Sequence, residues 1–221
     1  MNPARRKEGI KTISVDHVEI LVEEPSMETA LRLLLPKMIG DLSFEIYPYQ
    51  CKQDLLANLP DRLRGYRQWL IENWRIVVLL DLDDEDCRLL KDHLEQVAIA
   101  AGLSTKSTVL VEPYVVVNRL AIEELEAWYF GDWTAVRAAY PRVSRSIPYK
   151  AKYRDPDAIH GGTWEAFERI LKRAGYFAGG LRKIEAARAI AQYMTPEINR
   201  SKSFQVFRSC LREMVLEGKN R

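Results

Sequence analysis

The chain has 221 residues, 47% of them hydrophobic, which is enough for one large domain or for a domain with an appended subdomain. No run approaches the roughly 20 apolar residues that a membrane span requires, and the basic amino terminus lacks the apolar stretch of a secretory signal. Three scattered cysteines fit neither a disulfide framework nor a zinc site, so we expect a cytoplasmic protein.

Strand and helix patterns alternate through the first half of the chain, after a polar arm over residues 1–14. The predicted strands cover residues 15–22, 43–49, 75–81 and 109–117. The predicted helices between them cover residues 26–38, 53–73 and 84–101. Pro60 can split the second helix, Asp83 or Asp84 can cap the third, and Pro113 indicates an edge strand or a bulge. The alternation predicts an α/β fold with a parallel sheet flanked by helices.

From residue 121 onward the pattern becomes helical. The predicted helices cover residues 121–130, 132–140, 163–175, 181–194 and 201–217, with a connection rich in Pro, Gly and basic residues over 141–162. We therefore divide the chain into an α/β domain, 1–140, and a basic helical carboxyl-terminal extension, 141–221, packed on it. The extension has 17 Lys and Arg against 8 Asp and Glu, whereas residues 1–140 have 16 against 23. This asymmetry favours a cation site beside a polyanion-binding surface, although basic helices that simply face water would give the same count.

Acidic residues follow two of the predicted strands, where each strand ends. Glu23 comes directly after the first strand, and Asp81 and Asp83 close the third. The carboxyl ends of parallel strands gather at one edge of a sheet, and in extended chain residues two apart point the same way. Unpaired carboxylates repel each other, so neighbouring ones predict a Mg²⁺ or Mn²⁺ site. The alternative is an ordinary turn carboxylate followed by a helix cap.

The predicted helix over residues 121–130 adds two further candidate ligands. Glu124 and Glu126 flank Leu125 and border an apolar stripe, so either could turn toward a metal pocket or stay in water.

Basic residues of the extension are candidates for contacts with nucleic acid. They are Lys150, Lys152, Arg182, Lys183, Arg200 and Lys202. Tyr149, Tyr153 and Trp164 lie nearby in sequence and could stack on bases. Singly, each basic residue is also compatible with a solvated surface charge.

Four segments resemble the Toprim family, which includes topoisomerases, primases and OLD-type nucleases. Residues 22–26 (VEEPS) resemble its Val-Glu-Gly-Pro-Thr turn, and residues 79–84 (LLDLDD) its Asp-x-Asp strand end. Residues 122–128 (IEELEAW) and 201–207 (SKSFQVF) are similar to segments of small stand-alone Toprim proteins grouped as domain of unknown function 4276.

The resemblance implies a Mg²⁺- or Mn²⁺-dependent nuclease, an effector of bacterial anti-phage defence that works with an ATPase partner from a neighbouring gene. It also implies that Lys183 stabilises charge in the transition state. Two positions depart from the family pattern: Glu24 stands where the family has glycine, and Met27 where it often has an acid. No Gly-rich nucleotide loop of a common type occurs, so ATP hydrolysis is expected of a partner chain.

On this interpretation Asp81, Asp83 and an acid from residues 124–126 hold the ions, and Glu23 shares an ion or transfers a proton. One rival is a Toprim-like protein that binds nucleic acid or an ATPase without cutting. Another is a phosphotransferase or phosphatase with an aspartyl nucleophile among residues 81–83. The sequence leaves DNA or RNA as substrate, and the oligomeric state, open.

Overall fold

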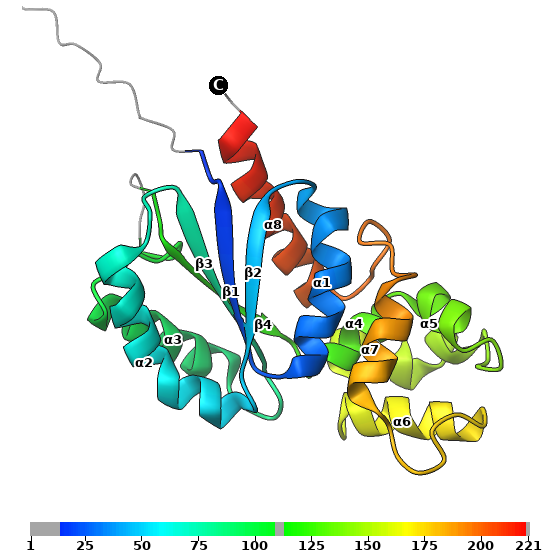
Figure 1. Cartoon of the computed structure of the whole chain (residues 1–221). Helices are drawn as coiled ribbons and strands as arrows, with labels where there is room; N and C mark the ends of the chain where they lie inside the picture. Colours follow the sequence, from blue (N-terminus) through cyan, green and yellow to red (C-terminus); the bar gives the residue numbers. More distant parts are fainter. Residues whose placement is uncertain (1–13, 109–112, 220–221) are drawn as a thin grey trace, which may run out of the picture.

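A four-stranded parallel sheet forms the centre of the molecule (Figure 1). The computed structural model describes residues 14–108 and 113–219. Its strands are β1 (His17–Val22), β2 (Ser43–Pro48), β3 (Trp74–Asp81) and β4 (Val116–Ala121). Their order is β2-β1-β3-β4, and every neighbouring pair is parallel. The predicted parallel α/β sheet flanked by helices, with a helical carboxyl-terminal part, is confirmed.

Helices cover both faces of this sheet and extend beyond one side of it. They are α1 (Pro25–Ile39), α2 (Lys52–Trp69), α3 (Cys87–Ala100), α4 (Leu125–Gly131), α5 (Trp133–Ala139), α6 (Thr163–Arg173), α7 (Lys183–Ala191) and α8 (Lys202–Lys219). Three short 3-10 helices, η1 (Ile147–Tyr149), η2 (Ala151–Tyr153) and η3 (Pro156–Ala158), lie in the connection before α6. Figure 1 shows α2 and α3 on one face of the sheet, α1 and α8 on the other, and α4 to α7 grouped beside α1.

Alternation along the strands produces two apolar cores. Leu21 of β1 and Val78 of β3 pack with the buried leucines of α2 and α3. Val22 and Leu79, one residue further along each strand, belong to the core under α1 and α8. Successive side chains of a strand point to opposite faces of the sheet, so a strand that is buried on both faces has a continuous apolar sequence.

The larger core joins the two halves of the chain. Leu34 of α1 belongs to the same buried cluster as Phe167 of α6, Ile190 of α7 and Phe204 of α8. Residues on either side of position 140 therefore share one core, which fixes the later helices against the sheet.

The fourth strand differs from the prediction. A strand over residues 109–117 was expected, but β4 begins at Val116 and continues to Ala121, where a helix was expected to start. Residues 109–112 lie outside the described part of the chain. The helix begins only at Leu125, after Glu123 adopts a left-handed backbone with φ of 63°. The spacing of apolar residues over so short a segment cannot distinguish the end of a buried strand from the start of an amphipathic helix.

Two helix details also differ. Pro60 does not split α2, which runs without a break from Lys52 to Trp69. The cap of α3 is Asp86, whose side chain accepts hydrogen bonds from the backbone N–H groups of Arg88 and Leu89, and not Asp83 or Asp84. Asp83 lies four residues before Cys87, the first residue of α3, and its N–H donates to the carbonyl of Glu123, which ties it to the segment after β4.

Within residues 14–108 and 113–219, no helix has the length and apolar character needed to cross a membrane.

Candidate functional site

Glu23 and Asp81 meet at the carboxyl edge of the sheet, as the sequence predicts. β1 and β3 are direct neighbours, with Val22 opposite Leu79, so the residues that follow each strand come together. The backbone N–H of Asp81 donates to Oε2 of Glu23 at 3.0 Å. This bond holds the first acidic turn against the end of β3.

Asp81 is a buried carboxyl with an unused oxygen. Its relative exposure is 3%, and Oδ1 has no hydrogen-bond partner among the described residues. Burial raises the pKa of Asp81 well above its ordinary value, and the carboxyls of Glu23 and Glu126 raise it further. An unsatisfied buried carboxyl is costly, and such groups concentrate where a protein binds a cation or a substrate.

Glu126 of α4 approaches the same place from a later part of the chain. It is 2% exposed, and its Oε2 also lacks a hydrogen-bond partner in the described structure. Burial raises its pKa to about 7, against the lowering effect of Lys183. Burial likewise raises the pKa of Glu23 to about 7, although the N–H of Asp81 opposes the shift. We call Glu23, Asp81 and Glu126 the carboxylate cluster.

Lys183, the first residue of α7, brings a positive charge to this cluster. Its Nζ lies 3.3 Å from Oε2 of Glu24 and 5.9 Å from the ring centre of Trp164. Burial lowers the pKa of Lys183, but the carboxylates of Glu126 and Glu24 outweigh it and leave the pKa raised. Lys183 is therefore a permanent cation beside the cluster.

Asp83 lies near the cluster, where its charge raises the pKa of Glu23 and of Asp81, but its carboxylate is bound by Lys52. Extended backbone was expected to align it with Asp81, but β3 ends at Asp81, and Asp83 has a left-handed φ of 52°. Its Oδ2 is 2.5 Å from Nζ of the buried Lys52, which also contacts Glu85 at 2.9 Å. A role for Asp83 as a metal ligand would require Lys52 to release it.

Glu124 and Glu126 have different environments. Oε2 of Glu124 accepts hydrogen bonds from the hydroxyl of Thr163 at 2.6 Å and from the N–H of Trp164 at 2.8 Å. Glu124 thus holds the start of α6 against the start of α4, a structural role. Glu126 is the acid of this pair that joins the cluster.

Sequence reasoning missed two residues of this region. The hydroxyl of Tyr129 is buried without a hydrogen-bond partner among the described residues. Its pKa is raised by burial and by the carboxyls of Glu126, Glu24 and Asp81, which places it beside the cluster. Tyr129 follows Glu126 by three positions, about one helical turn, so the two side chains lie on the same side of the helix. The sequence does not single out Tyr129, because it also fits the apolar stripe of that helix. Nothing in the sequence singles out Lys52 as the partner of Asp83.

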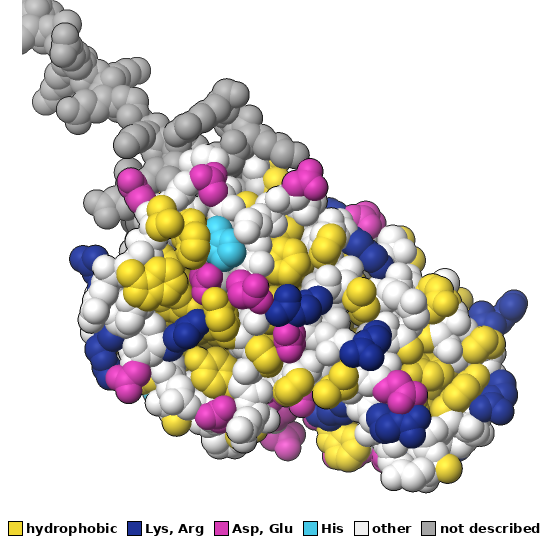
Figure 2. Space-filling model, viewed as in Figure 1, with side chains coloured by type: hydrophobic (Ala, Val, Ile, Leu, Met, Phe, Trp, Pro, Cys, Tyr) yellow, Lys and Arg dark blue, Asp and Glu magenta, His cyan; other side chains and the backbone are white. Residues whose placement is uncertain are grey.

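The predicted nucleic-acid contacts are distributed over several elements. Lys150, Lys152, Arg182, Arg200 and Lys202 all lie at the surface. Arg182 is paired with Glu185, and a guanidinium N–H of Arg200 donates to the carbonyl of Arg154 at 2.9 Å. On the face shown in Figure 2, Lys and Arg side chains are interspersed with acidic and apolar ones and do not form one patch.

The donor atoms of the carboxylate cluster fit a divalent metal ion. In the described part of the chain, no group of three or more His, Cys, Asp or Glu side chains has a geometry that could hold a metal ion. The chemistry of the donors nevertheless fits Mg²⁺ or Mn²⁺, because both ions take carboxylate oxygens. Oδ1 of Asp81 and Oε2 of Glu126 are buried, and no residue within 14–108 and 113–219 forms a hydrogen bond with either oxygen, so both could ligate such an ion.

The fold and the cluster define an α/β protein with an acidic site at the carboxyl edge of a parallel sheet. The model of the family described as Domain of unknown function (DUF4276) matches residues 22–214, and the chain belongs to this family, which confirms the resemblance. No curated protein matches the sequence.

Two solved structures are similar to the chain. One is the C-terminal region of the Xanthomonas campestris pv. campestris OLD protein, with 16% identity and a TM-score of 0.47 over 91% of this chain and 94% of that one. The other is the C-terminal region of the Burkholderia pseudomallei OLD protein, with 18% identity and a TM-score of 0.47 over 90% and 98%.

Proposed function

We propose that the protein is a metal-dependent nuclease that cleaves phosphodiester bonds at the carboxylate cluster. The observation that carries this proposal is a pair of buried oxygens, on Asp81 and Glu126, that have no hydrogen-bond partner among the described residues, in a cluster where Glu126 raises the pKa of Asp81. Carboxyls brought together out of water without partners are expensive to maintain. A site that binds a divalent cation gives a reason for their arrangement.

Asp81, Glu126 and Glu23 would hold the Mg²⁺ or Mn²⁺. A bound ion of this kind orients the phosphate, lowers the pKa of a water molecule and stabilises the leaving oxygen. Oδ1 of Asp81 and Oε2 of Glu126 have no hydrogen bond to a described residue that would have to break, whereas Glu23 would share its Oε2 with the N–H of Asp81.

The remaining chemistry belongs to the chain's own side chains. Glu23, with a pKa of about 7, is poised to accept or return a proton near neutral pH. Lys183 can stabilise negative charge that grows on the phosphate, since its ammonium stays charged beside the cluster. Exposed basic residues of the later helices would hold the strand through its phosphates.

The proposal includes a biological role in defence against phage. The cleaving protein would act in the cytoplasm in defence against phage, under the control of an ATPase encoded beside it. A nuclease of this kind requires restraint, and a partner that hydrolyses ATP would supply the trigger.

One observation favours a second candidate, a protein that binds nucleic acid or an ATPase without cutting. Glu24 stands at the glycine position of the Toprim turn, and its carboxylate pairs with Lys183 at 3.3 Å. This pair would compete with a phosphate for the lysine and would place a further negative charge where phosphate must approach.

The test is cleavage of labelled DNA and RNA oligonucleotides with Mg²⁺ or Mn²⁺ and with EDTA. We expect EDTA-sensitive cleavage that is lost in Asp81→Asn and Glu23→Gln, with the fold intact. Asp92→Asn, an exposed acid on α3, is the matched control and should cut like the wild type. Binding without cleavage under every metal condition would support the second candidate, and full activity in Asp81→Asn would refute the site.

A further inference from the structure

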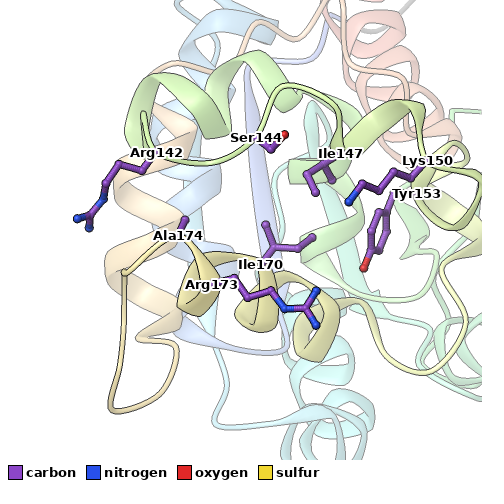
Figure 3. Close-up of a pocket in the computed structure, with 8 residues that line it drawn as sticks. All are labelled: Arg142, Ser144, Ile147, Lys150, Tyr153, Ile170, Arg173 and Ala174. Carbon is purple, nitrogen blue, oxygen red and sulfur yellow. The ribbon is translucent and has the colours of Figure 1, made fainter.

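A hollow of about 230 Å³ lies between the connection after α5 and the carboxyl-terminal half of α6 (Figure 3). Its lining residues are Arg142, Ser144, Ile147, Lys150, Tyr153, Ile170, Arg173 and Ala174. Three of the eight are basic and none is acidic. The hollow therefore has a positive charge that its own walls do not neutralise.

Two of the three cations are available to a ligand. The guanidinium of Arg142 donates to the carbonyl of Gly175 at 2.8 Å and lies 4.2 Å from the ring centre of Tyr176, and Figure 3 shows it pointing away from the other lining residues. Lys150 and Arg173 are exposed, and neither side chain has a hydrogen bond or ion pair with another described residue. Figure 3 shows these two side chains reaching into the hollow from different segments.

The floor of the hollow is apolar and firmly packed. Ile147 and Ile170 are 6% and 7% exposed. Tyr153 stacks on Phe130 with ring centres 5.3 Å apart and planes 13° apart, and Phe130 stacks in turn on Trp133. An apolar floor below two free cations suits a ligand that is part apolar and part anionic, as a nucleotide is with its base and phosphate.

The hollow is also at a useful distance from the carboxylate cluster. The first residues of α6 are bound by Glu124, and Trp164 lies beside Lys183. Arg173 ends the same helix ten residues after Thr163, which corresponds to about 15 Å along its axis. At about 3.4 Å per stacked nucleotide, a strand that follows α6 from the side of the cluster would need about five nucleotides to reach the hollow.

We propose that this hollow binds one nucleotide of a single-stranded nucleic acid whose cleaved phosphate lies at the carboxylate cluster. Lys150 and Arg173 hold the phosphate, and the base or sugar packs on Ile147 and Ile170. A single strand is required because its unpaired base can turn into a hollow, whereas a duplex keeps its bases stacked inside. The inference rests on the proposed function for the position of the reacting phosphate, but binding itself needs no cleavage.

The experiment measures fluorescence anisotropy of labelled strands of about 12 nucleotides, within the range of single-strand site sizes, with the Asp81→Asn protein in EDTA. Single-stranded DNA, single-stranded RNA, a blunt duplex and a free nucleoside monophosphate as competitor are compared across a salt series. We expect Lys150→Ala with Arg173→Ala to weaken single-strand binding about tenfold, the equivalent of one decade in Kd. The slope of log K against log salt should become shallower by about 0.7 for each phosphate that the variant no longer neutralises.

A control removes the same number of positive charges from α6, the helix that carries Arg173. Arg169 and Lys172 lie on α6 and do not line the hollow, so Arg169→Ala with Lys172→Ala should change single-strand binding far less. Ala174→Glu, which adds an anion to the hollow without removing a cation, should weaken the single strand as the double variant does. Circular dichroism of each variant verifies the fold.

Each outcome decides the proposal. A preferential decrease of single-strand affinity in Lys150→Ala with Arg173→Ala supports it, and the DNA and RNA arms identify the sugar preferred. An equal decrease in affinity for single strand and duplex would overturn the proposal, and so would an equal decrease in the control variant. Either result would mean that Lys150 and Arg173 act only as general surface charge. If the free nucleoside monophosphate competes with an affinity equal to that of the single strand, the hollow is a site for a small ligand, and the proposal is also overturned. Absence of cleavage by the wild type would refute the proposed function alone, since these measurements use uncut strands.

Discussion

Replacing Glu126 with glutamine should stabilise the metal-free protein above neutral pH. The pKa of Glu126 is raised by burial from 4.5 to about 7, so between these values the folded state holds a proton that the unfolded state has released. The stability from this proton is complete below pH 4.5 and is lost as the pH rises through 7. At about 1.4 kcal/mol per pKa unit, the ionised carboxylate costs up to about 3 kcal/mol at a pH of about 8.5, and glutamine cannot ionise.

Urea unfolding in EDTA from about pH 5 to about pH 9 measures this difference. The two proteins should have similar stability at the acidic end, and the variant should become the more stable one as the pH rises. Glu124→Ala is the control two residues away, and it should lose stability because the carboxylate of Glu124 accepts two hydrogen bonds from α6. A Glu126→Gln protein that is less stable than the wild type at every pH would refute the reasoning.

Two further predictions concern the ion and the basic surface. Mg²⁺ or Mn²⁺ should raise the melting temperature in differential scanning fluorimetry, by about 2–4 °C for each kcal/mol of binding. Asp81→Ala with Asp83→Ala should abolish that shift, and an equal shift in the variant would mean that the ions bind elsewhere. Alanine at four basic positions should flatten the salt dependence of nucleic-acid affinity by about 0.7 for each phosphate left without its cation, and an unchanged slope would make these residues a solvated face. The four positions are Lys150, Lys152, Arg182 and Lys183.

The meeting of Glu23 with Asp81 was predictable because it depends on features that a sequence displays directly. Each acid follows a continuous apolar run, and such runs in alternation with helices predict neighbouring parallel strands. The sequence did not require β1 and β3 to be adjacent. That order follows from packing of α1 on one face and of α2 and α3 on the other, which no local pattern specifies.

Local backbone choices were harder to predict. The two aspartates of Asp81-Leu82-Asp83 separate because Asp83 leaves extended geometry and is held by Lys52, which lies 31 positions earlier. Glu124 and Glu126 are equally placed beside Leu125 in the helical pattern, but only tertiary contacts decide that Glu124 binds α6 while Glu126 is buried. The ring of Tyr129 belongs to the core, as its sequence pattern indicates, but only the structure shows that its hydroxyl has no hydrogen-bond partner among the described residues.

The charges around the cluster lead to one more prediction, on how protons and metal ions compete. Glu24, Asp81 and Glu126 lie around the ammonium of Lys183, and the pKa values of Glu23 and Glu126 are about 7. Below that pH, bound protons relieve the repulsion that a divalent cation would otherwise relieve. Metal binding must then expel those protons, so affinity should rise with pH toward 7, by up to about tenfold per pH unit for each proton displaced. Calorimetric titration of the ion about one pH unit below these pKa values, in buffers of different ionisation enthalpy, measures the protons released. Release of none under these conditions would show that the ion binds away from the carboxyls with raised pKa values.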